Sequence, residues 1–579
     1  MQHFTSLRLL PPWHQSPIDR PRRPKGPRRH PYQAIALGVG SCLAGFLLST
    51  PAAAAERVYL SIGLFERSIA VHDLDIYARE GRVTNNLRPY LRYFTPKDQE
   101  QLRSLLTTQA DVSTVAVAQF LYTDQGEALL ERISRIIRTQ SPEAAPRAIR
   151  AALILAADSE EGLTPLNVLN KFPLTDLRIS VDATLNFVSE VENLINQTTQ
   201  AIQIIQTQAT FESRVETPID SMGVQNPHDV GLYDWRIVDL NLRDRRRDRA
   251  FDVDVYVPIT ETLGSPTPPM PAPVIVISHG LGSDRTTYRY LAKHLSSHGF
   301  VVAVLEHPGS NAMQIQALVQ GRVREVTSPR EFIDRPLDIT FLLDELERLN
   351  RSHPQLSGRM DLEKTGIIGQ SLGGYTALTL IGGTLHGERL IQSCYDDSWL
   401  NLSLLLQCQA LDLPLDILDQ SLKDDRIVAA IAINPIGSGI IGQNGFNQIE
   451  KPVMVMTGNA DTIAPALPEQ IRPFTWLGSV NKYLVLMQGA THFSTLGSSA
   501  NGSEALLLPS NIVGPDPAIA HRYVNAMSVA FFQTYVVDDP NYRGFLRATY
   551  ADRISEQALP LSLVRSLDPI QLSRVLSMP

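Results

Sequence analysis

The sequence predicts an α/β protein in which a mainly helical N-terminal domain precedes a mostly parallel β-sheet covered by helices on both faces. Between residues 230 and 537, short apolar runs rich in β-branched residues alternate with helical patterns, as in a sheet buried on both faces. Between residues 56 and 210, apolar residues recur every three or four positions, which is typical of amphipathic helices. A chain of 579 residues has room for two or three such units.

Residues 1–55 have the pattern of a secretory signal peptide. Seven basic residues precede the apolar stretch from Ala34 to Leu48, and a run of alanines ends at Ala55, after which we expect cleavage. A membrane anchor is the alternative, but the stretch is shorter than the roughly 20 residues that span a bilayer. Lipid attachment at Cys42 is a weaker alternative. The predicted location is the periplasm, the thylakoid lumen or the extracellular space.

The composition of the remaining chain excludes some classes of partner. Cleavage removes seven basic residues and one acidic residue, which leaves 45 Lys and Arg against 59 Asp and Glu, a formal charge of −14. Nucleic acids and anionic membrane surfaces are bound through clustered Lys and Arg, so neither is expected as a partner. A small-molecule or lipid ester, with transient contact to a lipid surface, is compatible with local apolar patches. Protein partners and oligomeric state are not indicated.

The N-terminal region contains no Ser-His-Asp or Cys-His set, and its role is not indicated. Its last predicted helix, Ser180 to Gln208, leads into a polar linker at residues 211–229, and residues 538–579 are expected to form a C-terminal tail. Between residues 230 and 537, the sequence predicts strands at Asp234–Leu242, Phe251–Val257, Val274–Ile277, Phe300–Leu305, Gly366–Gly369, Ile427–Ile433, Pro452–Met456 and Tyr483–Met487, with helices at Thr286–Ser297, Pro336–Arg351, Leu372–Ile381 and Pro517–Val536.

A nucleophile motif follows the fifth of these strands. Gly369-Gln-Ser-Leu-Gly373 has the form G-x-S-x-G, in which a sharp turn from strand to helix exposes a serine, here Ser371. The pattern also arises by chance, but its position between a predicted strand and a predicted helix supports it. This nucleophile elbow predicts an α/β-hydrolase fold.

A serine hydroxyl becomes a good nucleophile only when a base removes its proton, and in this fold the acid and then the histidine follow the serine along the chain. His492 lies just after the last sheet strand, whereas His521 lies within the final predicted helix. Asp461 follows the preceding strand and is the predicted acid, although an Asp there also suits a turn or a helix cap. We expect Ser371, Asp461 and His492 to form a catalytic triad, with Asp425 as the acid to test against Asp461.

Negative charge that develops on a substrate carbonyl oxygen is stabilised by backbone N–H groups. Ser278-His-Gly-Leu-Gly282 follows a predicted strand, so the expected donors are the amides of Leu281 and of Leu372, the residue after the serine. His279 in this motif is expected to be structural. No cofactor and no metal are expected.

At these motifs the sequence resembles the platelet-activating-factor acetylhydrolase family of α/β-hydrolases. The likeness is carried by the runs SHGLGSDRTTY from Ser278, SHGFVVAVLEH from Ser297 and EKTGIIGQSLGG from Glu363, which cover about the first half of the catalytic domain. The resemblance implies metal-free hydrolysis of short or truncated acyl esters of phospholipids, or carboxylesterase activity more widely. The N-terminal region also resembles a domain of unknown function that precedes such hydrolases in cyanobacteria. The resemblance implies that this region occurs together with a hydrolase and implies no activity of its own.

One departure from that family concerns the acid. Its members carry the triad aspartate after the strand that follows the elbow, where this chain reads Ile433-Asn-Pro, and Asn434 cannot serve. The resemblance therefore supports the fold and the reaction type better than it supports a phospholipid substrate.

Residues 382–423 form an insertion after the elbow helix. Its apolar helices suggest a lid or an acyl pocket, and packing against the N-terminal domain is an equally good alternative. The insertion contains Cys394 and Cys408, for which we expect a disulfide in an exported protein, with two buried thiols as the alternative.

Together these motifs predict an exported serine carboxylic-ester hydrolase, an esterase or lipase that forms an acyl-enzyme on Ser371. A catalytically inert lipid-binding or scaffold protein is the alternative from another class, and a polyester or lactone hydrolase is the second. The acyl length and the alcohol of the substrate stay open.

Overall fold

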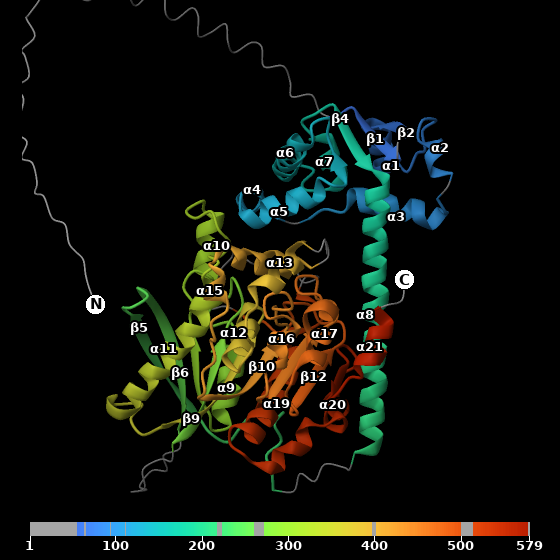
Figure 1. The fold of residues 1–579 in the computed structure, drawn as a ribbon. Helices are drawn as coiled ribbons and strands as arrows, with labels where there is room; N and C mark the ends of the chain where they lie inside the picture. The colour runs from blue at the N-terminus through green and yellow to red at the C-terminus, as the bar shows by residue number, and fades with distance from the viewer. Residues whose placement is uncertain are drawn as a thin grey trace, which may run out of the picture. The chain divides into compact units, whose positions relative to one another are not determined.

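Figure 1 shows the computed structural model, which describes residues 55–62, 65–92, 94–110, 112–216, 223–259, 271–395, 401–498 and 513–576. These residues belong to one compact unit that begins at Ala54. The predicted signal peptide, with Cys42, lies outside them except for Ala55, which is buried and donates its amide to the Phe172 carbonyl at 3.0 Å. Within the described part of the chain, no helix is both long and apolar enough to cross a membrane.

The N-terminal domain adds a small sheet to the predicted helices. The sheet has the order β2-β1-β4-β3, and β1 pairs with β4 in parallel. Its strands are two to six residues long and mix polar with apolar side chains. The alternation of apolar and polar residues that predicts a strand is therefore weaker here than the helical periodicity of the same region. The elements are β1 (Arg57–Ile62), β2 (Phe65–Ala70), α1 (Val71–Glu80), α2 (Arg88–Leu91), α3 (Pro96–Thr107), α4 (Thr114–Leu121), α5 (Asp124–Ile133), β3 (Ile137–Arg138), η1 (Pro142–Ala144), α6 (Ala145–Ala157), α7 (Pro165–Asn170) and β4 (Asp176–Ser180).

The second sheet confirms the predicted α/β-hydrolase architecture. Its nine strands have the order β13-β12-β11-β10-β9-β7-β8-β6-β5, with parallel pairing from β12 to β8 and antiparallel pairing at both edges. The segment set apart as a C-terminal tail supplies β13, which pairs with β12. The strands are β5 (Trp235–Asp244), β6 (Arg249–Pro258), β7 (Ala272–Ser278), β8 (Val301–Leu305), β9 (Met360–Gln370), β10 (Ile427–Ile433), β11 (Val453–Gly458), β12 (Lys482–Met487) and β13 (Leu561–Val564).

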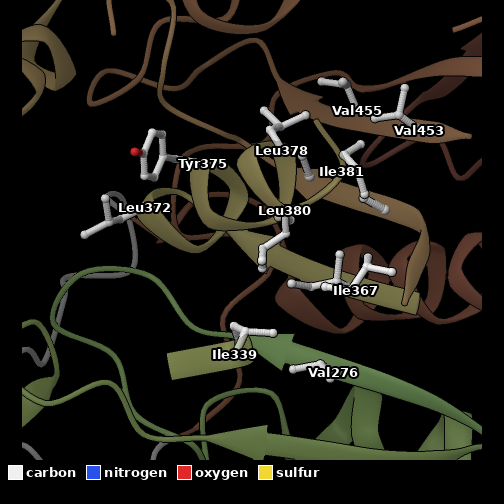
Figure 2. Close-up of a cluster of buried hydrophobic side chains, with 14 of the residues drawn as sticks. Val276, Ile339, Ile367, Leu372, Tyr375, Leu378, Leu380, Ile381, Val453 and Val455 are labelled. Atoms are coloured by element: carbon white, nitrogen blue, oxygen red, sulfur yellow. The ribbon is translucent and has the colours of Figure 1, made fainter. Parts of the chain in front are cut away.

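Helices cover both faces of this sheet. The helices α9 (Arg289–Ser297) and α19 (Pro517–Tyr535) pack on one face, and α11 (Glu331–Ser352) and α12 (Leu372–Leu380) pack on the other. Figure 2 shows side chains of α12 beside Val276 of β7, Ile367 of β9 and Val455 of β11. This packing fixes the position of α12 and of the turn that precedes it. Further elements are α10 (Ala312–Val319), α16 (Gly442–Asn447), η3 (Leu467–Ile471), α17 (Arg472–Trp476), η5 (Pro540–Leu546), α20 (Ala548–Ile554) and α21 (Pro569–Leu576).

The helix α8 (Val181–Val215) extends beyond the predicted Ser180–Gln208 and into the predicted linker. Its C-terminal half is buried in the hydrophobic cluster of the large sheet. Ile205 is fully buried there, together with Leu484 of β12 and Val564 of β13. This half of α8 is therefore part of the core of the hydrolase domain.

His294 of α9 and His298, the residue that caps this helix at its C-terminal end, bind the end of the predicted linker. His294 Nε2 lies 3.0 Å from the Pro227 carbonyl oxygen, and His298 Nε2 lies 2.9 Å from that of Asp229. Burial lowers the pKa of His294 to about 4 and also lowers the pKa of His298. Because the unfolded pKa is near 6.5, the unfolded chain binds protons at these sites before the folded chain does. Their contribution to stability is therefore lost as the pH falls below about 6.5.

Replacing His294 by Gln should make the free energy of unfolding less sensitive to acid, because Gln keeps an N–H donor for Pro227 and does not titrate. In the wild type, the uptake of one proton on unfolding removes about 1 kcal/mol of stability per pH unit between about pH 6.5 and pH 4. Urea unfolding at several pH values in this window measures the slope. Equal slopes for the wild type and His294→Gln would contradict the expectation.

Candidate active site

Ser371 occupies the turn between β9 and α12. Its backbone has φ 55° and ψ −117°, a strained conformation for a residue with a side chain. A Cβ on Gly369 would lie 1.8 Å from the Gly373 carbonyl oxygen, and a Cβ on Gly373 would lie 2.1 Å from the Ser278 carbonyl oxygen. The Ser371 amide donates to the Ile433 carbonyl at 2.9 Å, which ties the turn to the end of β10. The structure thus places Ser371 in a nucleophile elbow at the carboxyl ends of the parallel strands.

His492 and Asp461 come from the loops after β12 and β11 and meet at the same edge of the sheet. His492 Nδ1 lies 2.6 Å from Asp461 Oδ2, and both side chains are buried. Asp461 Oδ1 accepts hydrogen bonds from the amides of Ile463 and Ala464 at 2.9 and 2.7 Å. Each carboxylate oxygen therefore has a donor, and Oδ2 is directed at the imidazole. This bond places the proton on Nδ1 and leaves Nε2 free to act as a base.

In the described residues, no hydrogen bond joins Ser371 Oγ to His492. Catalytic hydrogen bonds are often long without substrate and shorten when it binds. His521 is engaged elsewhere, because its Nε2 lies 3.0 Å from the Leu496 carbonyl oxygen and its ring stacks on Tyr290 with 3.9 Å between centroids.

Asp425 lies just before β10, at the opposite end of the strand from Ile433. Its side chain is 88% exposed and forms an ion pair with Lys423 at 2.8 Å, which lowers the pKa of the Asp425 carboxyl. Asp461, and not Asp425, is therefore the carboxylate in contact with His492.

The loop from Ser278 to Gly282 presents the first expected oxyanion donor. His279 Nε2 accepts a hydrogen bond from the His307 amide at 3.0 Å, so the proton of the neutral imidazole is on Nδ1, which donates to the Gly280 carbonyl at 2.7 Å. Across a trans peptide the C=O and the next N–H point in opposite directions, so the Leu281 amide points away from His279. His279 therefore orients the peptide that carries the donor.

Leu372 is the first residue of α12, and its amide has no acceptor within the helix. Among the described residues, neither the Leu372 amide nor the Leu281 amide has a hydrogen-bond partner. Both N–H groups can therefore bind an oxygen that develops negative charge.

A buried ionic network contacts the loop from Ser278 to Gly282. The Arg335 guanidinium is fully buried and donates to the His279 carbonyl and to Ser310 Oγ, the latter at 3.2 Å. Burial lowers the pKa of Arg335 to about 10. Asp338 accepts from Arg249 Nη2 at 2.7 Å, and Glu331 accepts from Arg249 Nη1 at 2.8 Å. Sequence reasoning missed this network because its members lie far apart in the chain and match no motif.

Ser278, His307 and Asp338 also form a hydrogen-bonded Ser-His-Asp chain. Ser278 Oγ lies 3.0 Å from His307 Nε2, and His307 Nδ1 lies 3.1 Å from Asp338 Oδ2. All three side chains are fully buried, and burial lowers the pKa of His307 well below its usual value. A serine without solvent access cannot meet a substrate, so this chain supports the loop and is not a second catalytic site. No group of three or more His, Cys, Asp or Glu among the described residues is placed to hold a metal ion.

Two amide side chains hold the loop that carries His492. Gln370 Nε2 donates to the His492 carbonyl at 3.2 Å. Asn434 Nδ2 donates to the Thr491 carbonyl at 3.2 Å, while its Oδ1 accepts from the Gly458 amide at 3.1 Å. Asn434 has φ 41°, which asparagine tolerates better than most residues. Asn434, which cannot serve as the acid, thus connects the loop that carries His492 to the end of β11, which leads to Asp461.

Two families match separate parts of the chain. Residues 54–180 match the family described as "Alpha/beta hydrolase of unknown function (DUF1400)", and residues 255–336 match "Platelet-activating factor acetylhydrolase, isoform II". A platelet-activating factor acetylhydrolase of Cavia porcellus is 31% identical over 302 residues, which are 47% of this chain and 59% of that protein. The chain has the α/β-hydrolase fold, and its hydrolase domain is similar to platelet-activating factor acetylhydrolases.

Other relatives cover different shares of the hydrolase. A platelet-activating factor acetylhydrolase of Canis lupus familiaris is 30% identical over 141 residues, or 18% of this chain and 31% of the relative. Cutinase 2 of Thermobifida cellulosilytica is 22% identical over 280 residues, or 47% of this chain and 71% of the relative. The matched part of the chain thus spans 59% of the Cavia porcellus protein and 31% of the Canis lupus familiaris protein.

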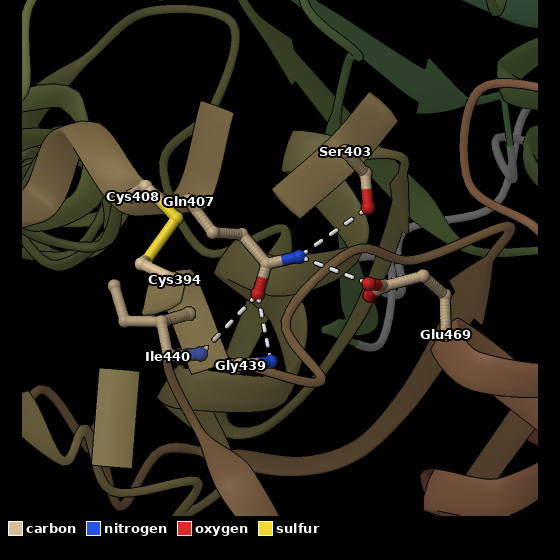
Figure 3. The surroundings of a disulfide bond; sticks show 7 residues. All are labelled: Cys394, Ser403, Gln407, Cys408, Gly439, Ile440 and Glu469. Carbon is tan, nitrogen blue, oxygen red and sulfur yellow. Dashed lines mark hydrogen bonds between the residues drawn. A yellow bond between two sulfur atoms is a disulfide. The ribbon is translucent and has the colours of Figure 1, made fainter. Parts of the chain in front are cut away.

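The insertion packs on the body of the hydrolase. It contains α13 (Gly387–Tyr395), α14 (Leu402–Cys408), η2 (Gln409–Asp412) and α15 (Leu415–Leu418). Gln407 of α14 accepts from the amides of Gly439 and Ile440 at 2.9 and 3.2 Å and donates to the buried Glu469 at 3.1 Å (Figure 3). Beside it, Cys394 and Cys408 form a disulfide with 5.9 Å between Cα atoms. These contacts join the insertion to the segment that follows β10.

Replacing Asp461 by Asn should reduce kcat/KM for esters by about 10³- to 10⁴-fold, because an amide N–H facing His492 Nδ1 favours the wrong tautomer. Asn can still accept the two amides that bind Oδ1, so the loop is retained. The matched control is Asp425→Asn, which should change kcat/KM little. Loss of activity only in Asp425→Asn would overturn the assignment of the acid.

Replacing both Cys394 and Cys408 by Ser should lower the free energy of unfolding by about 3 kcal/mol, because the closed loop spans 14 residues. Denaturant unfolding of the wild type, the double variant and the reduced wild type measures the difference. The double variant and the reduced wild type should agree. An unchanged midpoint would show that the bond does not stabilise the fold.

Proposed function

We propose that this chain is a serine carboxylic-ester hydrolase that works through an acyl-enzyme on Ser371. The observation that carries the proposal is the 2.6 Å hydrogen bond between His492 Nδ1 and Asp461 Oδ2, at the edge of the sheet that also holds the strained Ser371. Such a bond gives a histidine the tautomer and orientation of a general base. Relatives named platelet-activating factor acetylhydrolase and cutinase support the ester-hydrolase class.

In the proposed reaction, His492 Nε2 removes the proton of Ser371 Oγ as this oxygen attacks the ester carbonyl carbon. The amides of Leu281 and Leu372 stabilise the oxyanion, and Asp461 stabilises the imidazolium. The imidazolium then protonates the leaving alcohol. Water, activated by the same histidine, hydrolyses the acyl-enzyme and regenerates Ser371.

We also propose that the hydrolase is exported after removal of residues 1–55. The Cys394–Cys408 disulfide supports this, because disulfides persist in oxidising compartments. Phospholipid acyl esters are one candidate substrate class, supported by the acetylhydrolase relatives. Polyesters are a second, supported by the likeness to cutinases. The combination of elbow, base, acid and two free amides favours a working enzyme over an inert lipid-binding or scaffold protein.

Replacing Ser371 by Ala should reduce the hydrolysis of p-nitrophenyl acetate by about 10⁴-fold or more, because the nucleophile is removed. The wild type should also react covalently with a fluorophosphonate probe, with the label on Ser371. The control is Ser357→Ala, an exposed serine in a turn, which should behave as the wild type. Equal rates for the wild type and Ser371→Ala would reject the mechanism.

A further inference from the structure

A cavity of about 840 Å³ adjoins the loop that carries the catalytic acid. One wall is this loop, Asn459 to Thr462, which leaves the carboxyl end of β11. In α/β proteins, ligands bind in the crevice at these strand ends. Asp461 of the proposed triad therefore lines the cavity, and Ser371 and His492 lie outside its lining.

The opposite wall is one face of α8. Five apolar residues of α8 line the cavity, and because most are three, four or seven positions apart, they form one stripe of the helix: Phe187, Val191, Leu194, Ile195 and Ile202. The stripe is only partly covered: Ile195 is 58% exposed, whereas Ile202 is buried in the hydrophobic cluster of the large sheet. A partly exposed apolar stripe that lines a cavity of this size is typical of a ligand site.

The remaining lining residues define the chemistry of the ligand. Leu129 and Ile133 of α5 and Leu402 of the insertion add apolar surface. Among the described lining residues, Asp461 is the single ionisable one, and its side chain is fully buried against His492. A charged ligand would find no counter-charge in this cavity, whereas a hydrocarbon chain would bury apolar surface against α8, α5 and Leu402.

We propose that this cavity binds the long hydrocarbon acyl chain of the ester substrate. This inference rests on the proposed function and gives the N-terminal domain a role. Its helix α8 and helix α5 form the acyl site, while Ser371 and His492 act on the ester at the chain's carboxyl end. The site accepts chains well beyond an acetyl group, so the N-terminal domain sets the chain length that the hydrolase prefers.

The test compares p-nitrophenyl esters from acetate to decanoate with the full chain. In the wild type, kcat/KM rises by up to about fourfold for each methylene that enters the cavity. Val191→Trp, which places a larger side chain in the cavity and obstructs it, lowers kcat/KM for decanoate by more than about tenfold, the equivalent of two methylenes, and leaves acetate unchanged. The control, Asn196→Trp, places the same side chain on the exposed opposite side of α8 and leaves both unchanged.

A binding measurement separates this inference from the proposed function. Ser371→Ala binds the fluorescent fatty acid cis-parinaric acid, and adding Val191→Trp weakens the Kd by more than about tenfold. A Kd and a chain-length profile that Val191→Trp leaves unchanged overturn the acyl site, even where Ser371-dependent hydrolysis of acetate continues. If Val191→Trp loses binding but the wild type hydrolyses no ester, the result supports the cavity as a site for hydrocarbon chains and overturns the proposed function.

Discussion

The candidate active site depends on a close approach of backbone to backbone around Ser371. Strands β7 and β9 are neighbours, and their register pairs Ser278 with Gly369. The loop after β7 and the turn after β9 therefore leave the sheet side by side, which brings together the loops that carry the Leu281 and Leu372 amides. The approach leaves no room for a Cβ at Gly369 or Gly373. The strained backbone of Ser371 persists because α12 is packed on three strands and cannot relax away from them.

A second constraint is the charge buried beside the loop from Ser278 to Gly282, which carries an expected oxyanion donor. Removing charged groups from water is costly unless each finds hydrogen-bonding partners of opposite charge or suitable polarity. Arg335 is fully buried and finds them in the His279 carbonyl and Ser310, with Glu331 and Asp338 nearby as counter-charges. The result is a loop supported by fixed dipoles and charges. Such preorganised groups need little rearrangement when charge develops on a substrate, which is how an oxyanion site gains its effect.

The sequence was sufficient to predict the residues of the candidate triad, and the structure brings two of them, Asp461 and His492, into contact. Ser371 is marked by two glycines and a strand-to-helix context, and the order of acid and histidine along the chain singles out Asp461 and His492. The fold followed from apolar runs that only a doubly covered sheet explains. The sequence could not predict roles that depend on partners distant in the chain. Gln370 and Asn434 match no motif, and their role follows only from the position of the His492 loop beside β9 and β10. The short strand β13 likewise has a place only once β12 offers an edge.

The helix α8 lies in the interval between the two family matches, which end at residue 180 and begin at residue 255. Its buried half packs with β12 and β13, so part of the core is built from the middle and the far end of the chain. On the ribosome, Ile205 emerges roughly 20 to 70 s before Val564 at ordinary rates of elongation. During that interval the apolar side of α8 has no finished sheet to cover it. The hydrolase core can therefore close only near the end of translation, and a nascent chain of this kind has to be kept from aggregating until its last strand is made.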